Sequence, residues 1–438
     1  MRSLVTAVSA LALSVSSALA ADVTVLRTDA LVAVPGEGRP SEATILIEDN
    51  RILEVRAGSV SDSAIEADGH DIVASHDLSG HTVIPGLIDG HVHITSENNP
   101  RGRLQRVELS SADRALMGAG YARKTLMAGF TTVRDVGADG QAVFALRGAI
   151  ARGDVPGPRI LAAGNTVSIT GGHGDGTQGY NLHVAEVLKS PAVCDGPDDC
   201  RRAVREQIRR GADHIKITAT GGVLSNTRTG TEQQFTSEEM EAIVDAATKM
   251  GRDVTAHAHG KTGIEAALEA GVRTIEHGTY LDDRTIRAFR RNEAFLVPTL
   301  LAGATVAEWA ADPSTFLTPA QRAKSAEVGP LMQEMGRRAH EGGVKIAFGT
   351  DSGVSKHGEN AREFALMVSA GMTPAEAIRS ATVVGSKNIR MENDLGTIET
   401  GKFADIIAVK GNPFENVELL EDQVVFVMKG GEVFKAAD

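Results

Sequence analysis

The central part of the chain alternates short apolar runs with longer segments of helical periodicity. The apolar runs predicted as strands are residues 87–92, 131–136, 159–163, 214–218, 253–257, 274–276, 294–299 and 345–349. Between them, segments such as 201–210 and 238–250 carry apolar side chains at helical spacing. Repeated strand–helix units predict a parallel sheet, and eight in succession favour a closed barrel over an open, doubly wound sheet. The predicted fold class is α/β, with a (β/α)₈ TIM barrel over residues 85–390.

The two ends of the chain show a different pattern. Residues 22–84 contain several stretches in which apolar and polar residues alternate, and so do residues 404–409 and 424–428. This alternation is typical of half-buried strands. Neither end has enough apolar surface to fold alone. We therefore expect segments 21–84 and 391–438 to form one small β-sandwich together, with the barrel inserted between them.

The first twenty residues predict an export signal. Arg2 precedes an apolar run over residues 4–18, and the Ala-Leu-Ala at 18–20 fits a cleavage site, so the mature chain is expected to begin at Ala21. A buried first helix is the alternative. The run is short for a membrane span, and no later stretch is long enough. We expect residues 1–20 to be a signal peptide and the protein to be periplasmic or secreted, without membrane attachment once the leader is removed.

Two cysteines lie close together in the chain. Cys194 and Cys200 flank residues 195–199, which form a strong turn sequence. Two thiolates are too few for a metal site without a nearby histidine, so a local disulfide is favoured, and two free thiols are the alternative. An exported protein meets the oxidising conditions in which such a bond persists.

Composition excludes some partners. The 438 residues are 42% hydrophobic and 23% charged, as in ordinary soluble proteins, and the formal net charge is −12. Nucleic acid is not an expected partner, because its phosphates attract Lys and Arg. The negative charge also gives no reason to expect binding to an anionic membrane surface.

Residues suited to metal coordination lie at or near the C-terminal ends of the predicted strands. They are His91, His93, Lys216, His257, His277 and Asp351. His91 and His93 are two residues apart and therefore point to the same side of a strand, as two ligands of one ion must. Barrel active sites are built at this end of the strands. The pattern predicts a metal centre, for which histidine and carboxylate ligands suit zinc or a similar divalent ion.

This set of residues resembles the amidohydrolase superfamily. Its binuclear members carry H-x-H after strand one, a Lys on strand four, a His on each of strands five and six, and an Asp after strand eight. The resemblance covers almost the whole mature chain, including the split sandwich. It implies two divalent metal ions, with zinc expected, and a CO₂ adduct (carbamate) on Lys216 that bridges them. An ordinary salt-bridged lysine is the alternative for Lys216. The resemblance also implies a homo-oligomer, with an octamer among the forms it allows.

Four glycine-containing motifs narrow the resemblance. They are TGGHG at 170–174, TGGVLS at 220–225, AHAHG at 256–260 and GTDSG at 349–353. Together they look like the branch that holds prolidase-like Xaa-Pro dipeptidases, Arg/Lys carboxypeptidases and ochratoxin-hydrolysing amidases. In that branch a His after strand three, and a His or Tyr two residues past the strand-five ligand, contact the scissile group. His173 and His259 occupy these positions, and His at 259 favours the carboxypeptidase and amidase side. A loop histidine without substrate contact is the alternative for each.

The expected reaction is hydrolysis of a small-molecule amide or dipeptide that ends in a C-terminal amino acid. Two metal ions would lower the pKa of a bridging water to give hydroxide near neutral pH. Asp351 would accept the proton of that water and return it to the leaving amine. His259 or His173 would stabilise the carbonyl oxygen.

Substrate specificity is less defined by the sequence. Val223 and Leu224 are expected to line the pocket, and Arg228, Lys356 and His357 are the candidates for binding a substrate carboxylate. One alternative function is hydrolysis of a cyclic amide or imine, as in hydantoin- or imidazolone-hydrolysing relatives. Another is a metal-bearing binding or structural protein without turnover, which would require a missing ligand or base.

Overall fold

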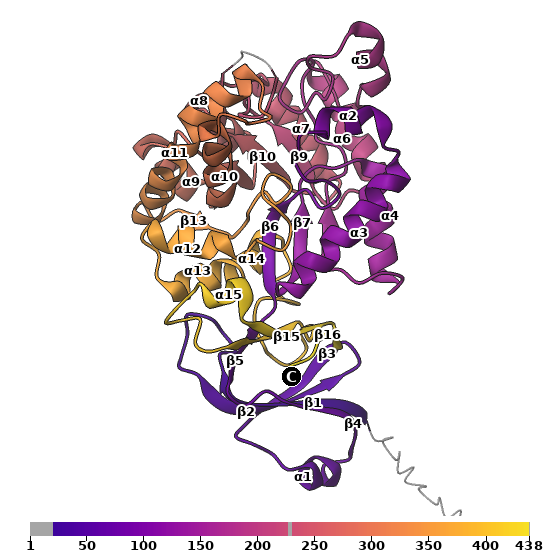
Figure 1. The fold of residues 1–438 in the computed structure, drawn as a ribbon, viewed down its shortest axis with the longest axis vertical. Coiled ribbons are helices and arrows are strands. Elements are labelled where there is room, and N and C mark those ends of the chain that lie inside the picture. The colour runs from indigo at the N-terminus through magenta and orange to yellow at the C-terminus, as the bar shows by residue number, and fades with distance from the viewer. Residues whose placement is uncertain (1–20, 227–229, 438) are drawn as a thin grey trace, which may run out of the picture.

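The structure is a computed structural model that describes residues 21–226 and 230–437 (Figure 1). The predicted leader and the candidate Arg228 lie outside the described residues. A large body of strands and helices forms one end of the elongated molecule, and a smaller body of strands forms the other (Figure 1). The chain enters the large body from the small one and returns to it at the C-terminus.

The large body is a parallel barrel. Its strands are β6 (Leu87–Val92), β7 (Phe130–Asp135), β8 (Arg159–Ala162), β9 (Ile215–Thr218), β10 (Val254–Ala258), β11 (Thr274–His277), β12 (Phe295–Val297) and β13 (Lys345–Ile346). They pair in two runs, β6 to β8 and β9 to β13. Backbone hydrogen bonds join the runs on both sides, from Val167 N to Lys216 O at 2.8 Å and from Gly90 N to Phe348 O at 2.9 Å. The predicted α/β barrel is therefore confirmed.

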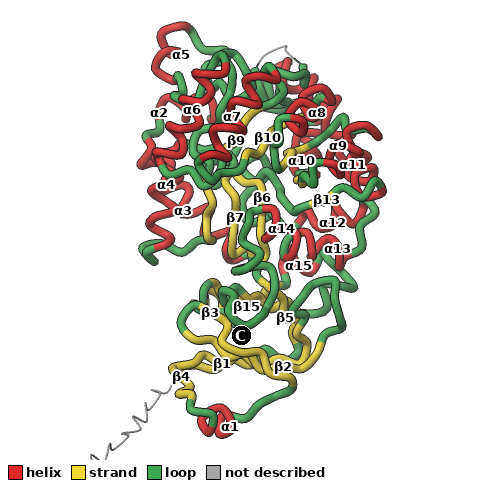
Figure 2. The backbone as a smooth tube through the Cα atoms, turned by 180° about the vertical axis from the view of Figure 1, so that it is seen from behind, coloured by secondary structure: helices red, strands yellow, loops and turns green. Residues whose placement is uncertain are grey.

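Helices surround the strands on the outside (Figure 2). They are α2 (Gly102–Glu108), α3 (Ser111–Met127), α4 (Gly140–Ala151), α5 (Leu182–Leu188), α6 (Pro197–Arg210), α7 (Ser237–Lys249), α8 (Lys261–Glu269), α9 (Asp283–Arg291), α10 (Leu300–Ala311), α11 (Pro319–Glu341), α12 (Arg362–Ser369), α13 (Pro374–Ser380) and α14 (Val383–Asn388). Capping boxes start α7 at Thr236 and α13 at Thr373. Helix α7 lies where helical spacing predicted it.

Three element boundaries differ from the predictions by two residues or more. Helix α6 begins at Pro197 rather than at residue 201, because proline suits the first helical position and the two aspartates that follow suit the positive end of the helix. The predicted strand 294–299 ends at Val297, since Pro298 has no N–H to donate. The predicted strand 345–349 pairs regularly only over Lys345–Ile346.

The small body combines both ends of the chain. Its strands are β1 (Ala21–Leu31), β2 (Ser41–Glu48), β3 (Arg51–Ala57), β4 (His70–Asp77), β5 (His81–Pro85), β14 (Ile406–Lys410), β15 (Val424–Lys429) and β16 (Glu432–Lys435), with short helices α1 (Asp62–Ala67) and α15 (Leu419–Asp422). Strand β14 pairs antiparallel with β5, in the order β16-β15-β14-β5-β1-β2-β3. Leu26, Ile45, Phe426 and Met428, from both ends, share one buried core. The prediction that the two ends form one β unit is confirmed.

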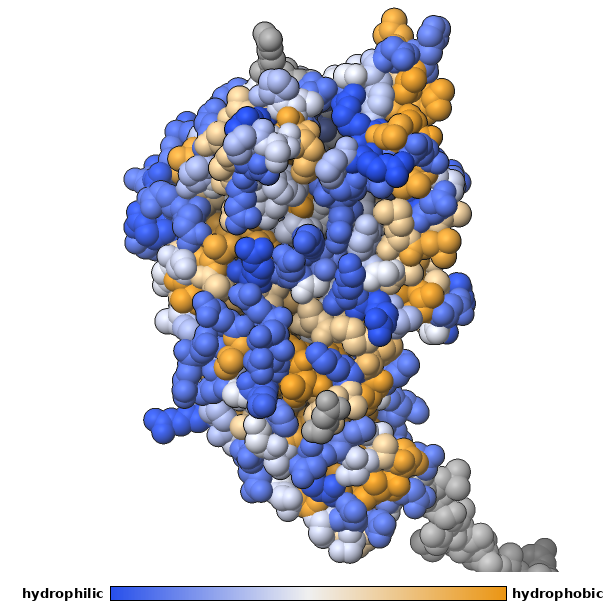
Figure 3. Space-filling model, in the orientation of Figure 1, coloured by the Kyte–Doolittle hydropathy of each residue, from blue (hydrophilic) through white to orange (hydrophobic). Residues whose placement is uncertain are grey.

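The surface is mostly hydrophilic, with hydrophobic side chains gathered over α5 at one corner of the barrel (Figure 3). Leu182 and Val187 of α5 are each 84% exposed. Within the described residues, no helix combines the length and the apolar character needed to cross a membrane.

The predicted disulfide between Cys194 and Cys200 is confirmed. Both residues are buried, and Cys200 lies in the first turn of α6. Cys194 N donates to Ser168 O at 2.9 Å, in the loop that follows β8. The disulfide and this hydrogen bond together therefore fasten the start of α6 to the loop that carries His173.

We predict a modest loss of stability in a Cys194→Ala/Cys200→Ala variant. A closed loop this short constrains the unfolded chain by about 2 kcal/mol. For a chain of this length, that lowers the melting temperature by roughly 2 °C. Scanning calorimetry checks the shift, and reductant should produce it in the natural protein but not in the variant. Equal melting temperatures for the variant and the natural protein, both without reductant, would contradict the prediction.

Candidate active site

The strand ends of the barrel hold all of the predicted metal ligands. His91 lies in β6, and His93 follows the end of that strand. Lys216 lies in β9, His257 in β10 and His277 at the end of β11, while Asp351 follows β13. All are buried except His93, whose side chain is 30% exposed. Ligands from five strands reach one place because all the strands of a parallel barrel end on the same face.

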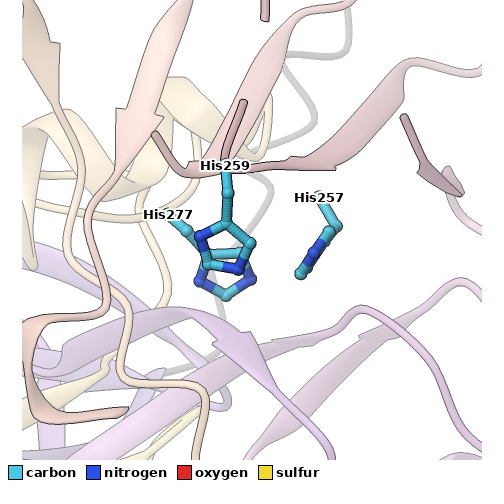
Figure 4. A group of neighbouring side chains, drawn as sticks. All are labelled: His257, His259 and His277. Carbon is cyan, nitrogen blue, oxygen red and sulfur yellow. The ribbon is translucent and has the colours of Figure 1, made fainter. Parts of the chain in front are cut away.

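Two overlapping groups of side chains have the spacing of metal ligands. The ligand atoms of His257, His259 and His277 lie within 4.8 Å of one another, and so do those of His91, His277 and Asp351. In Figure 4 the imidazoles of the first group face a common point, with the rings of His259 and His277 stacked. His277 belongs to both groups, so the two potential ion positions adjoin. The sequence predicted His259 as a substrate contact, but in the structure it also has the spacing of a metal ligand relative to His257 and His277.

Asp351 provides an acceptor atom without a donor. Its Oδ1 is buried, lies 3.4 Å from Nε2 of His91 and 3.2 Å from Nε2 of His93, and makes no hydrogen bond among the described residues. Burial alone would raise the pKa of Asp351, but the two histidines hold it well below its usual range. A carboxylate oxygen and imidazole nitrogens aimed at one point form a donor set that suits a divalent cation, so the residues fit a metal centre.

Hydrogen bonds at Nδ1 orient most of the histidines. The partners are Glu276 Oε2 for His91 at 2.7 Å, Gly137 O for His93 at 2.5 Å, Thr299 Oγ1 for His277 at 2.7 Å, Thr279 Oγ1 for His259 at 2.7 Å and Ser225 Oγ for His173 at 2.8 Å. Such bonds fix the ring and leave Nε2 for a metal or a substrate. His257 differs, because its Nε2 lies 3.4 Å from Gly221 O, which leaves Nδ1 to face the site.

His173 and His259 have different hydrogen-bonding options. The Ser225 hydroxyl donates to Gly222 O at 2.9 Å, so it accepts from Nδ1–H of His173 and leaves Nε2 of that ring as an acceptor. The Thr279 hydroxyl can donate to Nδ1 of His259, which leaves Nε2–H as a donor. Burial lowers the pKa of His173 to about 3 and that of His259 to about 4, so both rings are neutral near pH 7.

A buried ion pair beneath the ligands was not predicted from the sequence. Glu276 is fully buried and accepts from Arg134 at 2.8 Å, from His91 and from the Thr255 hydroxyl. Burial would raise the pKa of Glu276, but Arg134 and His91 lower it to about 2, so the carboxylate is ionised. The sequence offered two signals for this pair: Glu276 directly precedes the predicted ligand His277, and Arg134 lies inside a predicted apolar strand. Glu276 therefore supports His91 from behind.

Left-handed backbone conformations occur at ligand positions. His277 has φ of 74° and Asp351 has φ of 57°, a region that non-glycine residues rarely adopt. Alternation along a strand would place Glu276 and His277 on opposite sides of the sheet. The backbone turn at His277 instead brings both side chains to His91, since the rings of His277 and His91 have centroids 5.2 Å apart. Strained residues of this kind persist where the surrounding structure holds them and are common at functional sites.

The remaining candidates are not members of the two ligand groups. Val223 is buried and Leu224 half-buried in the loop after β9. His357 is buried, stacks on Tyr121 and directs Nε2 to Ser96 O at 3.0 Å. Burial lowers the pKa of His357 to about 4. The side chain of Lys356 is 78% exposed. His357 and Lys356 therefore belong to neither group of ligands.

Comparison with known proteins places this architecture among hydrolases. Residues 82–434 match the model of the Amidohydrolase family. The chain is 32% identical to ochratoxinase of Aspergillus niger, over 97% of this chain and 89% of that protein. A crystal structure of a Xaa-Pro dipeptidase with methionine bound in its active site matches with a TM-score of 0.88 and 41% identity, covering 94% of this chain and 100% of that one. The crystal structure of A. niger ochratoxinase matches with a TM-score of 0.82 and 30% identity, covering 95% and 96%.

We predict that Glu276→Gln weakens both metal binding and stability. The change leaves Arg134 buried without its carboxylate and weakens the support of His91. Loss of such a supporting partner typically lowers metal affinity by roughly 10- to 100-fold, and breaking a buried ion pair costs about 3–5 kcal/mol. Competition with a chromophoric chelator measures the affinity, and denaturant unfolding measures the stability. The exposed Glu341→Gln on α11 is the control. Natural metal affinity in Glu276→Gln would contradict the role assigned to Glu276.

Proposed function

This chain belongs to the amidohydrolase family and is a metal-dependent hydrolase, and from that premise we propose that it cleaves the amide bond to a C-terminal amino acid. The acyl side would be an acyl or aminoacyl group, so the activity would be that of a dipeptidase, a carboxypeptidase or an N-acyl amino acid amidase. The observation that carries the proposal is the pair His173 and His259. His259 belongs to one of the ligand groups and His173 lies beside it, and the two neutral imidazoles offer one donor and one acceptor to an amide.

The names of the related proteins support this choice of substrate. One relative is a Xaa-Pro dipeptidase with a free amino acid, methionine, in its active site, and another is an ochratoxinase. Both are at least 30% identical to this chain over most of its length. We therefore propose small amides and dipeptides as substrates, and amino acids among the products.

We propose that two divalent ions, with zinc expected, occupy the site. His91, His93, Lys216, His257, His277 and Asp351 would hold them. When bound, such ions supply an activated water and polarise the carbonyl of the substrate. Lys216 would carry a carbamate, because an anion between two cations lowers their repulsion where an ammonium would add to it. Burial lowers the pKa of Lys216 to about 8, which favours the uncharged amine that CO₂ modifies.

The side chains of the site would handle the protons as follows. Asp351 is ionised and its Oδ1 has no donor, so it can take the proton of the attacking water and return it to the leaving amine. His259 would donate from Nε2 to the carbonyl oxygen, where negative charge develops. His173 would accept from an N–H of the substrate or from water, because its Nε2 carries a lone pair. The oxyanion role is therefore assigned to His259 rather than to His173.

We also propose that the protein acts after export and as a homo-oligomer. The disulfide between Cys194 and Cys200 fits an oxidising compartment. The exposed Leu182 and Val187 on α5 form the kind of apolar surface that a subunit contact covers.

A substrate screen with the zinc-loaded enzyme tests the function. We expect chromatography to detect amino acids released from dipeptides and N-acyl amino acids, and a chelator to abolish the release. Asp351→Asn keeps an oxygen ligand but removes the proton acceptor, so turnover should fall by about 10²- to 10⁴-fold with at least one metal ion retained. Turnover of hydantoins or imidazolones in place of open amides would favour the alternative reaction. Absence of any turnover would indicate a binding protein.

Substitution of Lys216 tests the carbamate. We predict that Lys216→Ala loses metal and activity together, and that short carboxylic acids added with metal restore part of both. Lys216→Arg is the matched control, because it keeps a cation that cannot form the carbamate, and acids should not rescue it. Metal analysis and activity assays measure the outcome. Two tightly bound ions in Lys216→Ala would overturn the assignment.

A further inference from the structure

A half-buried lysine lies beside the site without a carboxylate partner. Lys324, on α11, donates from Nζ to Gly222 O at 2.7 Å and to Ser225 O at 2.9 Å. Burial lowers the pKa of Lys324 to about 8. No carboxylate in the described part of the chain lies within ion-pair distance of it. An ammonium has three N–H donors, so one remains for a ligand.

The loop that Lys324 contacts also touches His173. Gly222 lies so close to His173 that a Cβ on Gly222 would stand 2.3 Å from the imidazole, and Ser225 Oγ bonds Nδ1 of the same ring. The His173 ring in turn contacts His257, with centroids 4.3 Å apart. Contacts therefore run from Lys324 through the loop and His173 to the predicted metal ligand His257.

Lys324 also borders a pocket at the strand ends. The pocket has a volume of about 390 Å³, and its walls include Gly260, Tyr280 and Val328. Gly260 directly follows His259, and Tyr280 N donates to His259 O at 3.1 Å, so the pocket adjoins the backbone of that residue. The pocket therefore lies within one residue of His259, the proposed donor to the carbonyl oxygen.

Two of the other charged groups of this pocket are engaged by neighbours. Lys261 pairs with Asp282, and Glu327 accepts from Tyr280 Oη at 2.8 Å. Glu232 also lines the pocket but forms no ion pair with Lys324. An ammonium half removed from water, without an anion, is unfavourable unless a ligand supplies the charge. Lys324 is therefore the cation in this pocket that a ligand carboxylate would complete.

We propose that Lys324 binds the carboxylate of the C-terminal amino acid of the substrate. The inference rests on the proposed amide hydrolysis, because the carboxylate of an amino-acid leaving group lies only a few bonds from the carbonyl under attack. Lys324 replaces two of the candidates drawn from the sequence, Lys356 and His357. Lys356 is exposed beside Glu359, and His357 is buried and bonded to the backbone. Specificity for the carboxylate would then come from helix α11, which comes after β12, rather than from the loop after β13.

The same helix offers a control for a merely structural role. Gln321 lies one turn before Lys324 and donates from Nε2 to Leu224 O at 2.7 Å. Both residues fasten the loop after β9, but only Lys324 carries a charge. Gln321→Met removes one hydrogen bond to the loop and one capping-box bond of α11. Lys324→Met removes two hydrogen bonds to the loop and the charge, and both substitutions change the side-chain volume little.

The test compares N-benzoyl-L-amino acids with their C-terminal carboxamides as substrates of the zinc-loaded enzyme. The natural protein should prefer the free acids. Lys324→Met should lower kcat/KM for the acids roughly 10- to 150-fold and leave the carboxamides nearly unchanged, as expected for loss of a charge-assisted hydrogen bond. Lys324→Arg should keep part of the preference, and Gln321→Met should keep all of it. An equal loss for both substrate series in Lys324→Met would overturn the proposal.

The inference and the proposed function fail in different ways. If no benzoyl compound is hydrolysed, the same pairs are titrated by calorimetry as ligands of the natural protein and of Lys324→Met. Tighter binding of the acids that is lost in Lys324→Met would support Lys324 although hydrolysis is refuted. Equal affinity for acids and carboxamides, or no binding of the acids, would overturn the assignment of Lys324.

Discussion

The site depends on the contact between the first and last strands of the barrel. Asp351 N donates to His91 O at 2.8 Å, and His93 N donates to Ser352 O at 2.7 Å, so ligands 260 positions apart in sequence become neighbours through backbone hydrogen bonds. The strands approach closely because glycine stands at Gly90, where a Cβ would meet Phe348 O at 2.8 Å. Closure also removes sheet edges that would otherwise expose unpaired backbone groups. Stability and the assembly of the ligands therefore rest on the same seam.

Charge inside the barrel is arranged in layers. Glu276 and Arg134 form a buried pair below the ligands, and Asp89 accepts from His91 N, Thr350 and Asn360 across the seam. Every one of these buried charges is hydrogen-bonded, as burial of an unpaired charge would be very costly. The predicted ligands above them are four imidazoles, Lys216 and one carboxylate whose Oδ1 lacks a donor among the described residues. The fold thus pairs its supporting charges internally and keeps the unsatisfied ones facing the site.

The loops above the barrel are held as firmly as the strands. The disulfide fastens the loop that carries His173, and α11 fastens the loop after β9 through Gln321 and Lys324. These attachments come from different parts of the chain and meet at His173. The result is a fixed wall beside the predicted metal ligands, on the side where the substrate is proposed to bind, and such preorganisation lowers the cost of orienting a substrate.

The sequence by itself determined the barrel, the shared terminal β unit, the disulfide and the positions from which ligands come. The barrel, the β unit and the ligand positions follow from local periodicity and from the rule that parallel strands end on one face. The disulfide follows from two cysteines that flank a turn sequence. Only the tertiary structure decided that Glu276 and His277 both reach His91, because the left-handed backbone at His277 breaks the alternation that a sequence predicts. It alone also decided that Lys324, on a helix without any motif, stands beside His173. Such proximity depends on how distant segments pack, and the pattern along one segment carries no record of the side chains that will face it.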